Sequence, residues 1–152
     1  AMKLETFLQQ QGVGYEKHAH PVTYTSQHLA QAEHVPGYAV AKPVIVRCNS
    51  HFAMCVLPAP KHLDLARAAE ALHEPGLRMA TESEMSDLFP DCELGAEPPV
   101  GKMYGLPTVM DQELKHNEYL VMQAGTHTDA IRMRREDWER VCQPQVATIA
   151  AG

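Results

Sequence analysis

Long apolar segments are missing from this 152-residue sequence. No run of about 18 apolar residues is present, so we expect no helix that crosses a bilayer. The N-terminal stretch AMKLETFLQQQG also lacks the apolar core of a secretory signal peptide, and its pattern is that of an amphipathic helix. These two absences predict a cytoplasmic protein with no membrane contact.

Basic residues are also scarce. Thirteen Lys and Arg stand against nineteen Asp and Glu, which gives a net charge of -6. Proteins that coat nucleic acid by releasing counterions are usually strongly basic, so this class is disfavoured. A pocket that binds only a short end of a nucleic acid remains compatible with the charge.

Recognisable metal and disulfide spacings are absent. The four cysteines show no C-x-x-C pair, and Cys48 and Cys55 lie in apolar stretches, so we expect reduced, structural thiols. His18 and His20 share one side of a predicted strand, but no HExxH motif or Cys-His cluster accompanies them. The sequence therefore predicts no metal and no cofactor.

Apolar residues make up 45% of the chain, enough for one compact domain over residues 1–152. Helical and strand patterns are interleaved, and Asn49-Ser50 separates two apolar runs that predict a buried hairpin. The fold class is therefore α/β, in the sense of a mixed α+β domain. Ser26 is the expected cap of the second helix, and Thr81-Glu-Ser-Glu84 is a capping box. The predicted helices are 3–11, 26–35, 63–72, 81–89 and 136–141, and the predicted strands are 13–17, 44–46, 52–57, 119–123 and 130–133.

Residues 91–107 hold three glycines and three prolines, which predicts an irregular segment. Its glycines would let the main chain approach a ligand, and its amides could hold an oxyanion; a surface loop without a ligand is the alternative.

Lys42, next to a buried strand, either reaches water or meets an anion in a cleft. His127, in the turn between the last two strands, is either structural or a proton donor and acceptor. No GxSxG motif is present, and no Cys-His pair stands out as a nucleophile and base.

The order of several short motifs resembles the YbaK/EbsC group, also called the prolyl-tRNA synthetase-associated editing domain. The resemblance covers about residues 4–141, nearly the whole chain. The motifs are His20-Pro21, Val40-Ala-Lys42, Val56-Leu-Pro-Ala59, Ala80-Thr-Glu-Ser-Glu84, a G-x-x-x-P-x-G loop (Gly95, Pro99, Gly101), Leu106-Pro107, Asp111 and Ala124-Gly125.

This resemblance implies a curled mixed sheet, like a partial barrel, flanked by helices. It also implies a trans-acting deacylase that hydrolyses the ester of a wrong amino acid on tRNA, often Cys or Ala on tRNA(Pro). The implied partners are the acceptor CCA end of a mischarged tRNA and an aminoacyl-tRNA synthetase, with no cofactor. An activated ester can be hydrolysed by positioning and an oxyanion site, without a catalytic triad.

The resemblance also implies roles for particular residues. Lys42 corresponds to a lysine thought to hold the terminal adenosine's phosphate or the aminoacyl group. The loop of Gly95, Pro99 and Gly101 corresponds to one whose amides position the ester, while water attacks with help from a ribose hydroxyl.

Two segments depart from the family's pattern. Glu97-Pro98 is expected to make the loop's rim more acidic and stiffer, and the turn after Gly125 is not glycine-rich. That turn is expected to border the amino-acid pocket, where pocket details decide specificity. We expect His127, with Met103 or Tyr104 beside it, to tune the pocket. The residues expected to bind substrate are Met103, Tyr104, Gly125, His127 and Asp129.

Two other functions remain open. A descendant of an editing domain could bind aminoacyl-tRNA or a synthetase without hydrolysis, and the same pocket could hydrolyse another activated ester or amide. Lys42 and the G-x-x-x-P loop together favour the deacylase, because a pure adaptor need not keep both. Function still has to be argued from the site, since a fold alone does not fix it.

Overall fold

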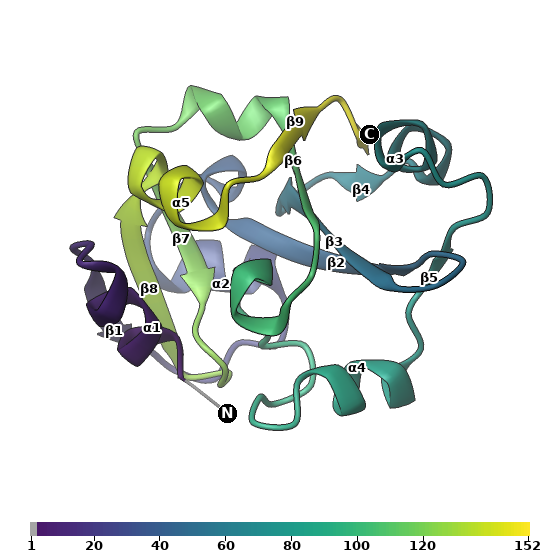
Figure 1. The fold of residues 1–152 in the computed structure, drawn as a ribbon. Coiled ribbons are helices and arrows are strands. Elements are labelled where there is room, and N and C mark those ends of the chain that lie inside the picture. Colours follow the sequence, from purple (N-terminus) through teal and green to yellow (C-terminus); the bar gives the residue numbers. More distant parts are fainter. Residues whose placement is uncertain (1–2) are drawn as a thin grey trace.

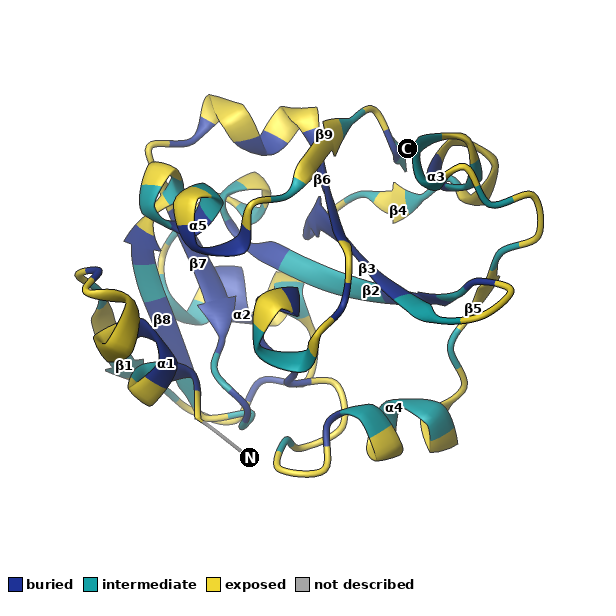
Figure 2. Cartoon of the chain, in the orientation of Figure 1, coloured by how far each residue is buried: buried dark blue, intermediate teal, exposed yellow. Residues whose placement is uncertain are grey.

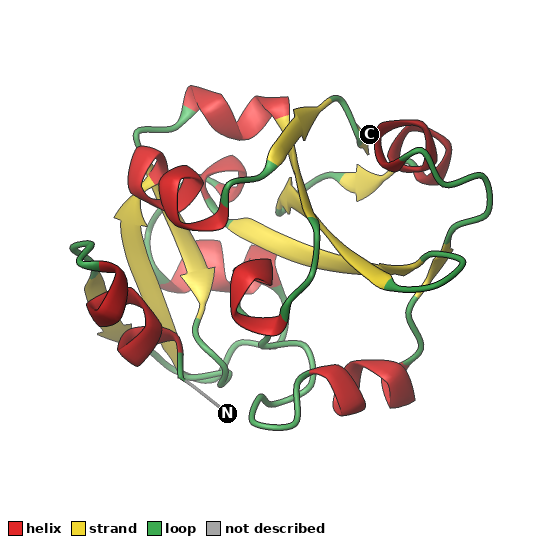
Figure 3. Ribbon diagram, viewed as in Figure 1, coloured by secondary structure: helices red, strands yellow, loops and turns green. Residues whose placement is uncertain are grey.

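Strands of mixed direction form the centre of the molecule, and helices lie around them (Figures 1 and 3). This computed structural model describes residues 3–152. The strands are β1 Glu16–Ala19, β2 Ala41–Arg47, β3 Phe52–Pro58, β4 His62–Leu63, β5 Arg78–Met79, β6 Thr108–Asp111, β7 Tyr119–Gln123, β8 Asp129–Arg134, β9 Gln145–Ala147 and β10 Ala150–Ala151. The α-helices are α1 Leu4–Gln11, α2 Ser26–Ala32, α3 Leu65–Leu72, α4 Glu82–Leu88 and α5 Arg135–Cys142, and the 3-10 helices are η1 Gly37–Ala39, η2 Gly101–Tyr104 and η3 Gln112–His116.

The predicted hairpin is the centre of the largest sheet. β2 and β3 pair in antiparallel register from Ala41 opposite Pro58 to Arg47 opposite Phe52. The sheet has the order β5-β2-β3-β6-β9, and β3 is parallel to β6. All of β3 after Phe52 is buried, which explains why its sequence does not alternate between apolar and polar residues.

A second sheet has the order β1-β8-β7, with antiparallel neighbours. A single parallel bridge between Val40 and Val121 joins β7 to the start of β2. β10 and β4 form a separate antiparallel pair. The five-stranded sheet is mixed, the other two are antiparallel, and the described strands do not close into a barrel, which confirms the predicted mixed α/β class.

Helices α1 and α5 pack against the second sheet, and their buried faces share one core cluster with it (Figure 2). α1 contributes Leu4, Phe7 and Leu8, which are at most 8% exposed. Trp138 of α5 is completely buried. None of the helices within residues 3–152 has the length and apolarity needed to cross a membrane.

The helix caps and ends predicted from the sequence agree with the structure in one case and differ from it in another. The capping box is confirmed: Thr81 accepts the Glu84 N–H at 3.1 Å, and the Glu84 carboxylate accepts the Thr81 N–H at 2.9 Å. The predicted cap of α2 was wrong by one residue, because Thr25 Oγ1, not Ser26, accepts the His28 N–H at 3.0 Å. That helix also ends at Ala32, three residues earlier than predicted.

Strand β6 was missed altogether, because it follows directly on the irregular segment and pairs only with distant strands. The first strand begins at Glu16 rather than at Val13.

Candidate functional site

Lys42 is a half-buried cation inside β2, where it lies opposite Leu57. It is the second residue of the strand, not the residue before it as the sequence predicted. Its Nζ donates to the Ala59 carbonyl at 2.8 Å, and it has no ion-pair partner within residues 3–152. Burial lowers the pKa of Lys42 from its ordinary value, because the charged form loses hydration. Because its one described partner is an uncharged carbonyl, the ammonium can meet an anion by giving up this bond.

A cleft of about 550 Å³ opens in front of Lys42. Its other walls come from Ala59 and from the first turns of α2 with their cap, and no carboxylate lines it. The lining side chains are polar or small: Thr25, Ser26, Gln27, His28, Gln31, Lys42 and Ala59. The cleft thus combines one cation with uncharged polar groups, which suits a phosphate or a polar ester.

The loop from Glu93 to Gly101 is held to the turn that follows β7. The Gly125 N–H donates to the Ala96 carbonyl at 2.9 Å, and the Glu93 N–H donates to the Gly125 carbonyl at 2.8 Å. Gly95 has φ +88°, a left-handed conformation that favours glycine. The structure therefore brings this loop and Gly125 together.

Glu97 does not lie on the rim of the loop as predicted. It is only 5% exposed, and its Oε2 accepts the Gly95 N–H at 3.0 Å. The carboxylate satisfies a backbone donor from inside the loop, so it stiffens the loop without making its rim more acidic. The Ala96 N–H is also used internally, donating to the Glu93 carbonyl at 3.0 Å.

Pro99 and Gly101 connect this loop to the core. The Pro99 carbonyl accepts the Nε1–H of Trp138 at 2.9 Å. A Cβ at Gly101 would lie 2.2 Å from Thr108 Oγ1 and 2.8 Å from the Leu106 carbonyl, so only glycine fits there. Both residues are buried and fix the position of the loop.

His127 joins three segments. Its Nδ1 lies 2.9 Å from the Thr23 carbonyl, and its Nε2 lies 2.9 Å from the Leu94 carbonyl. Its backbone N–H donates to the Glu93 carboxylate at 2.7 Å, and its ring lies 5.0 Å from that of Tyr24. Because carbonyl oxygens only accept, a neutral imidazole can donate to one of them and a protonated one to both.

Met103 and Tyr104 lie in η2 and pack against the main core cluster. The Tyr104 hydroxyl is 3.4 Å from the Cys92 Sγ, and burial raises the pKa of this phenol. His127, which the sequence was expected to place beside Met103 or Tyr104, makes its hydrogen bonds to Thr23, Glu93 and Leu94.

Asp129 accepts the Thr126 hydroxyl at 2.6 Å and stabilises the turn after β7. Together with Gly125 and Cys92 it lines a second cavity of about 170 Å³, which does not include Lys42. The segment from Thr23 to Thr25 connects the two regions, because Thr23 contacts His127 and Thr25 lines the Lys42 cleft.

Within residues 3–152, three polar side-chain atoms are buried without a hydrogen-bond partner: His20 Nε2, Thr23 Oγ1 and Gln123 Oε1. Sequence reasoning had singled out His20 but neither Thr23 nor Gln123. Buried polar groups are normally paired, so each of these is available to a ligand or water. Gln123 ends β7, whose Val121 bridges to Val40 near the start of β2. A polar residue at the end of an otherwise apolar strand was the available signal for it.

The thiols do not offer an activated nucleophile. Burial raises the pKa of Cys55 and of Cys142 to about 12, and burial also raises the pKa of Cys92. Since the thiolate is the reactive form, burial disfavours these thiols as nucleophiles.

Comparison with known proteins shows one family. The sequence model of the aminoacyl-tRNA editing domain matches residues 20–141. None of the curated proteins matches the sequence.

Three solved structures share the fold. A protein proposed to be a trans-editing enzyme for prolyl tRNA synthetase is 24% identical, with a TM-score of 0.88 over 98% of this chain and 95% of its own. The hypothetical protein APE2540 is 20% identical, with a TM-score of 0.89 over 99% of this chain and 100% of its own. A proposed signal transduction protein from Marinobacter aquaeolei is 16% identical, with a TM-score of 0.75, and the match covers 96% of this chain but only 30% of that protein.

Proposed function

This chain belongs to the aminoacyl-tRNA editing domain family, and from that membership we propose that it is a trans-acting deacylase. Its substrate is the ester between a wrong amino acid and tRNA, with tRNA(Pro) as the first candidate. The acceptor CCA end of the tRNA is the part that enters the site, and an aminoacyl-tRNA synthetase is a second partner. A site for this one end needs a local cation rather than a basic face, which agrees with the net charge of -6.

The observation that carries this proposal is the ammonium of Lys42 in its cleft. It is half-buried, carries no counter-charge within residues 3–152 and faces a cavity of about 550 Å³. Burial strengthens its interaction with an anion, because screening by water is reduced. Lys42 therefore binds the terminal phosphate or the polar aminoacyl ester, exchanging its bond to the Ala59 carbonyl for the substrate.

In this proposal the loop of Gly95, Pro99 and Gly101 positions the ester, and His127 with the segment 23–25 connects this loop to the Lys42 cleft. Pro99 and Gly101 hold the loop against the core. Gly95 is its exposed part, where the main chain is open to a ligand. The Gly95 amide is bonded to Glu97, so an oxyanion contact with this amide would require that bond to open.

His127 acts as a positioning residue. It ties the loop at Leu94 to the segment at Thr23, which continues into the wall of the Lys42 cleft. Substrate choice then depends on how His127 sets the distance between these segments, with Met103, Tyr104 and Asp129 supporting the surrounding structure.

Water is the nucleophile in this proposal. It attacks the ester carbonyl with help from the ribose hydroxyl of the tRNA, the C–O bond breaks, and the ribose oxygen takes a proton. No thiolate is needed, which fits the raised pKa values of the cysteines. Positioning and charge stabilisation suffice because the ester is already activated.

A second candidate is a non-catalytic module that binds aminoacyl-tRNA or a synthetase. The observation in its favour is that the same fold makes up 30% of a longer protein proposed to act in signal transduction. The fold therefore also occurs as one part of a larger chain.

The test is deacylation of Ala, Cys, Ser and Thr esters on tRNA(Pro) and on other tRNAs. Wild type is compared with Lys42→Ala and with Lys61→Ala, a control two residues after Ala59 that does not line the cleft. We expect one ester to be cleared, with kcat/KM about 100-fold lower in Lys42→Ala because an electrostatic contact to the reacting group is lost. Lys61→Ala should match wild type. If tRNA binds and no ester is cleared, the deacylase is refuted and the binding module takes its place.

A further inference from the structure

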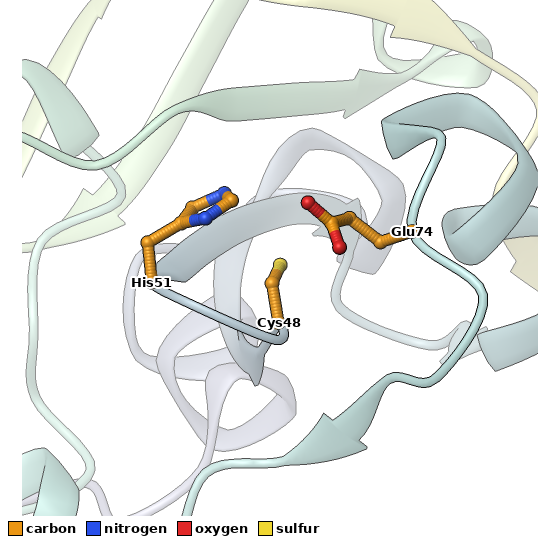
Figure 4. Close-up of side chains that lie close together, drawn as sticks. All are labelled: Cys48, His51 and Glu74. Atoms are coloured by element: carbon orange, nitrogen blue, oxygen red, sulfur yellow. The ribbon is translucent and has the colours of Figure 1, made fainter.

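Three side chains with metal-binding groups converge at the end of the β2–β3 hairpin that is far from Lys42 (Figure 4). They are Cys48, His51 and Glu74, and one ligand atom from each lies within 4.8 Å of the other two. Cys48 is only 2% exposed, and the other two are half-buried. This is the one such group of His, Cys, Asp and Glu side chains within residues 3–152.

The backbone holds the three residues in place. The Cys48 N–H donates to the His51 carbonyl at 2.7 Å, which closes the turn of the hairpin. The Glu74 N–H donates to the Ala69 carbonyl at 2.9 Å, where α3 ends in a left-handed His73. These backbone hydrogen bonds close both turns and so hold the three ligand-bearing residues near one another.

The Glu74 carboxylate has no other evident role. It takes part in no ion pair and no side-chain hydrogen bond of residues 3–152. Burial and the charge of Glu74 both raise the pKa of the Cys48 thiol, while Arg47 lowers it.

The donor set selects the kind of metal. A thiolate, an imidazole and a carboxylate together suit Zn²⁺, whereas Mg²⁺ and Ca²⁺ take oxygen ligands. In a zinc site the metal lies about 2.0–2.3 Å from each ligand. Two ligand atoms of such a tetrahedral site are about 3.3–3.8 Å apart, so the present separations, which are within 4.8 Å, would have to shorten by about 1 Å at most.

We propose that Cys48, His51 and Glu74 form a Zn²⁺ site that joins the tip of the β2–β3 hairpin to the end of α3. Cys48 Sγ, one His51 ring nitrogen and one Glu74 oxygen are the protein ligands, and water completes the tetrahedron. Binding releases the Cys48 thiol proton to solvent. The site is structural and separate from the proposed editing site, so neither proposal depends on the other.

Metal titration of the chelator-treated protein tests this proposal. We expect one Zn²⁺ per chain by calorimetry, and a rise in Tm of about 5–10 °C at 100 times the Kd. Co²⁺ should give a thiolate-to-metal charge-transfer band, which Cys48→Ser abolishes. His51→Gln and Glu74→Gln should each weaken Zn²⁺ binding at least about tenfold.

Glu70→Gln is the matched control, because Glu70 is an exposed carboxylate on α3 outside the cluster, and it should bind Zn²⁺ like wild type. Glu74→Gln removes a half-buried carboxylate that supports no other contact, so it keeps the test decisive if Cys48→Ser does not fold. The proposal is wrong if no saturable binding of one Zn²⁺ is seen. It is equally wrong if the Co²⁺ band persists in Cys48→Ser, or if Glu74→Gln binds as tightly as wild type.

Discussion

The hydrogen bond from Trp138 to Pro99 fixes the candidate substrate loop to the core of the molecule. The indole Nε1–H is completely buried and donates to the Pro99 carbonyl at 2.9 Å. Trp138→Phe keeps an aromatic ring but removes the donor. The Pro99 carbonyl is then left buried without this partner.

The expected loss of stability has two parts. A buried acceptor without a donor costs about 1–3 kcal/mol. The void left by the smaller ring adds about 1 kcal/mol. The free energy of unfolding should therefore fall by about 2–4 kcal/mol, and Tm by roughly 5–15 °C for a chain of this length. Deacylation should fall as well, because Pro99 no longer fixes the loop.

Urea unfolding followed by far-UV circular dichroism measures this loss, since Trp138 is the only tryptophan and its fluorescence disappears in the variant. Tyr104→Phe is the control: its hydroxyl contacts the weakly polar Cys92 sulfur at 3.4 Å, and its loss should cost under about 1 kcal/mol. A fall of less than 1 kcal/mol in Trp138→Phe would refute the reasoning that this bond anchors the loop.

Three further predictions concern separate parts of the chain. Gly101→Ala should lower the free energy of unfolding by about 1–3 kcal/mol, because its Cβ would lie 2.2 Å from Thr108 Oγ1; an unchanged urea midpoint would contradict this. Arg78 lowers the pKa of Glu84 to about 2, so the stabilisation it gives is present above about pH 4.5 and is lost as the pH falls toward 2. Glu84→Gln should therefore show a smaller drop in urea midpoint than wild type between pH 5 and pH 2.5. His127→Ala should change the order of preference among mischarged tRNAs, and an unchanged order in the deacylation panel would exclude a role for His127 in specificity.

Local signals predicted the elements that local interactions determine. The capping box at Thr81 and the hairpin around Asn49-Ser50 depend on residues close in sequence, and both formed as predicted. β6 was missed because its four residues follow a glycine- and proline-rich segment, and its partners β3 and β9 are distant in sequence. Its pairing comes from tertiary packing, which outweighs local propensity.

In the candidate sites, too, some residues were identifiable from local sequence and others only from the fold. Lys42 was identifiable because a lysine in an apolar strand is unusual. The burial of Glu97 was not, since it depends on how the loop folds back over its own Gly95 amide. Cys48 and His51 are three residues apart, but Glu74 lies 23 residues after His51 and is placed by the end of α3. A ligand set of this kind becomes visible only when the fold brings its members together.

The β2–β3 hairpin also determines how the two proposed sites interact. Cys48 follows Lys42 by six residues along an extended segment, which corresponds to about 20 Å. At that distance one unit of charge contributes under about 1 kcal/mol even at an effective dielectric constant of about 20. Zn²⁺ at Cys48 should therefore change the electrostatics at Lys42 only slightly while it stabilises the hairpin tip. We expect kcat/KM for deacylation, measured well below Tm, to be equal in the zinc-loaded and zinc-free protein, although their Tm values differ. A change in kcat/KM on zinc removal at such temperatures would mean that the hairpin transmits a conformational change between its ends.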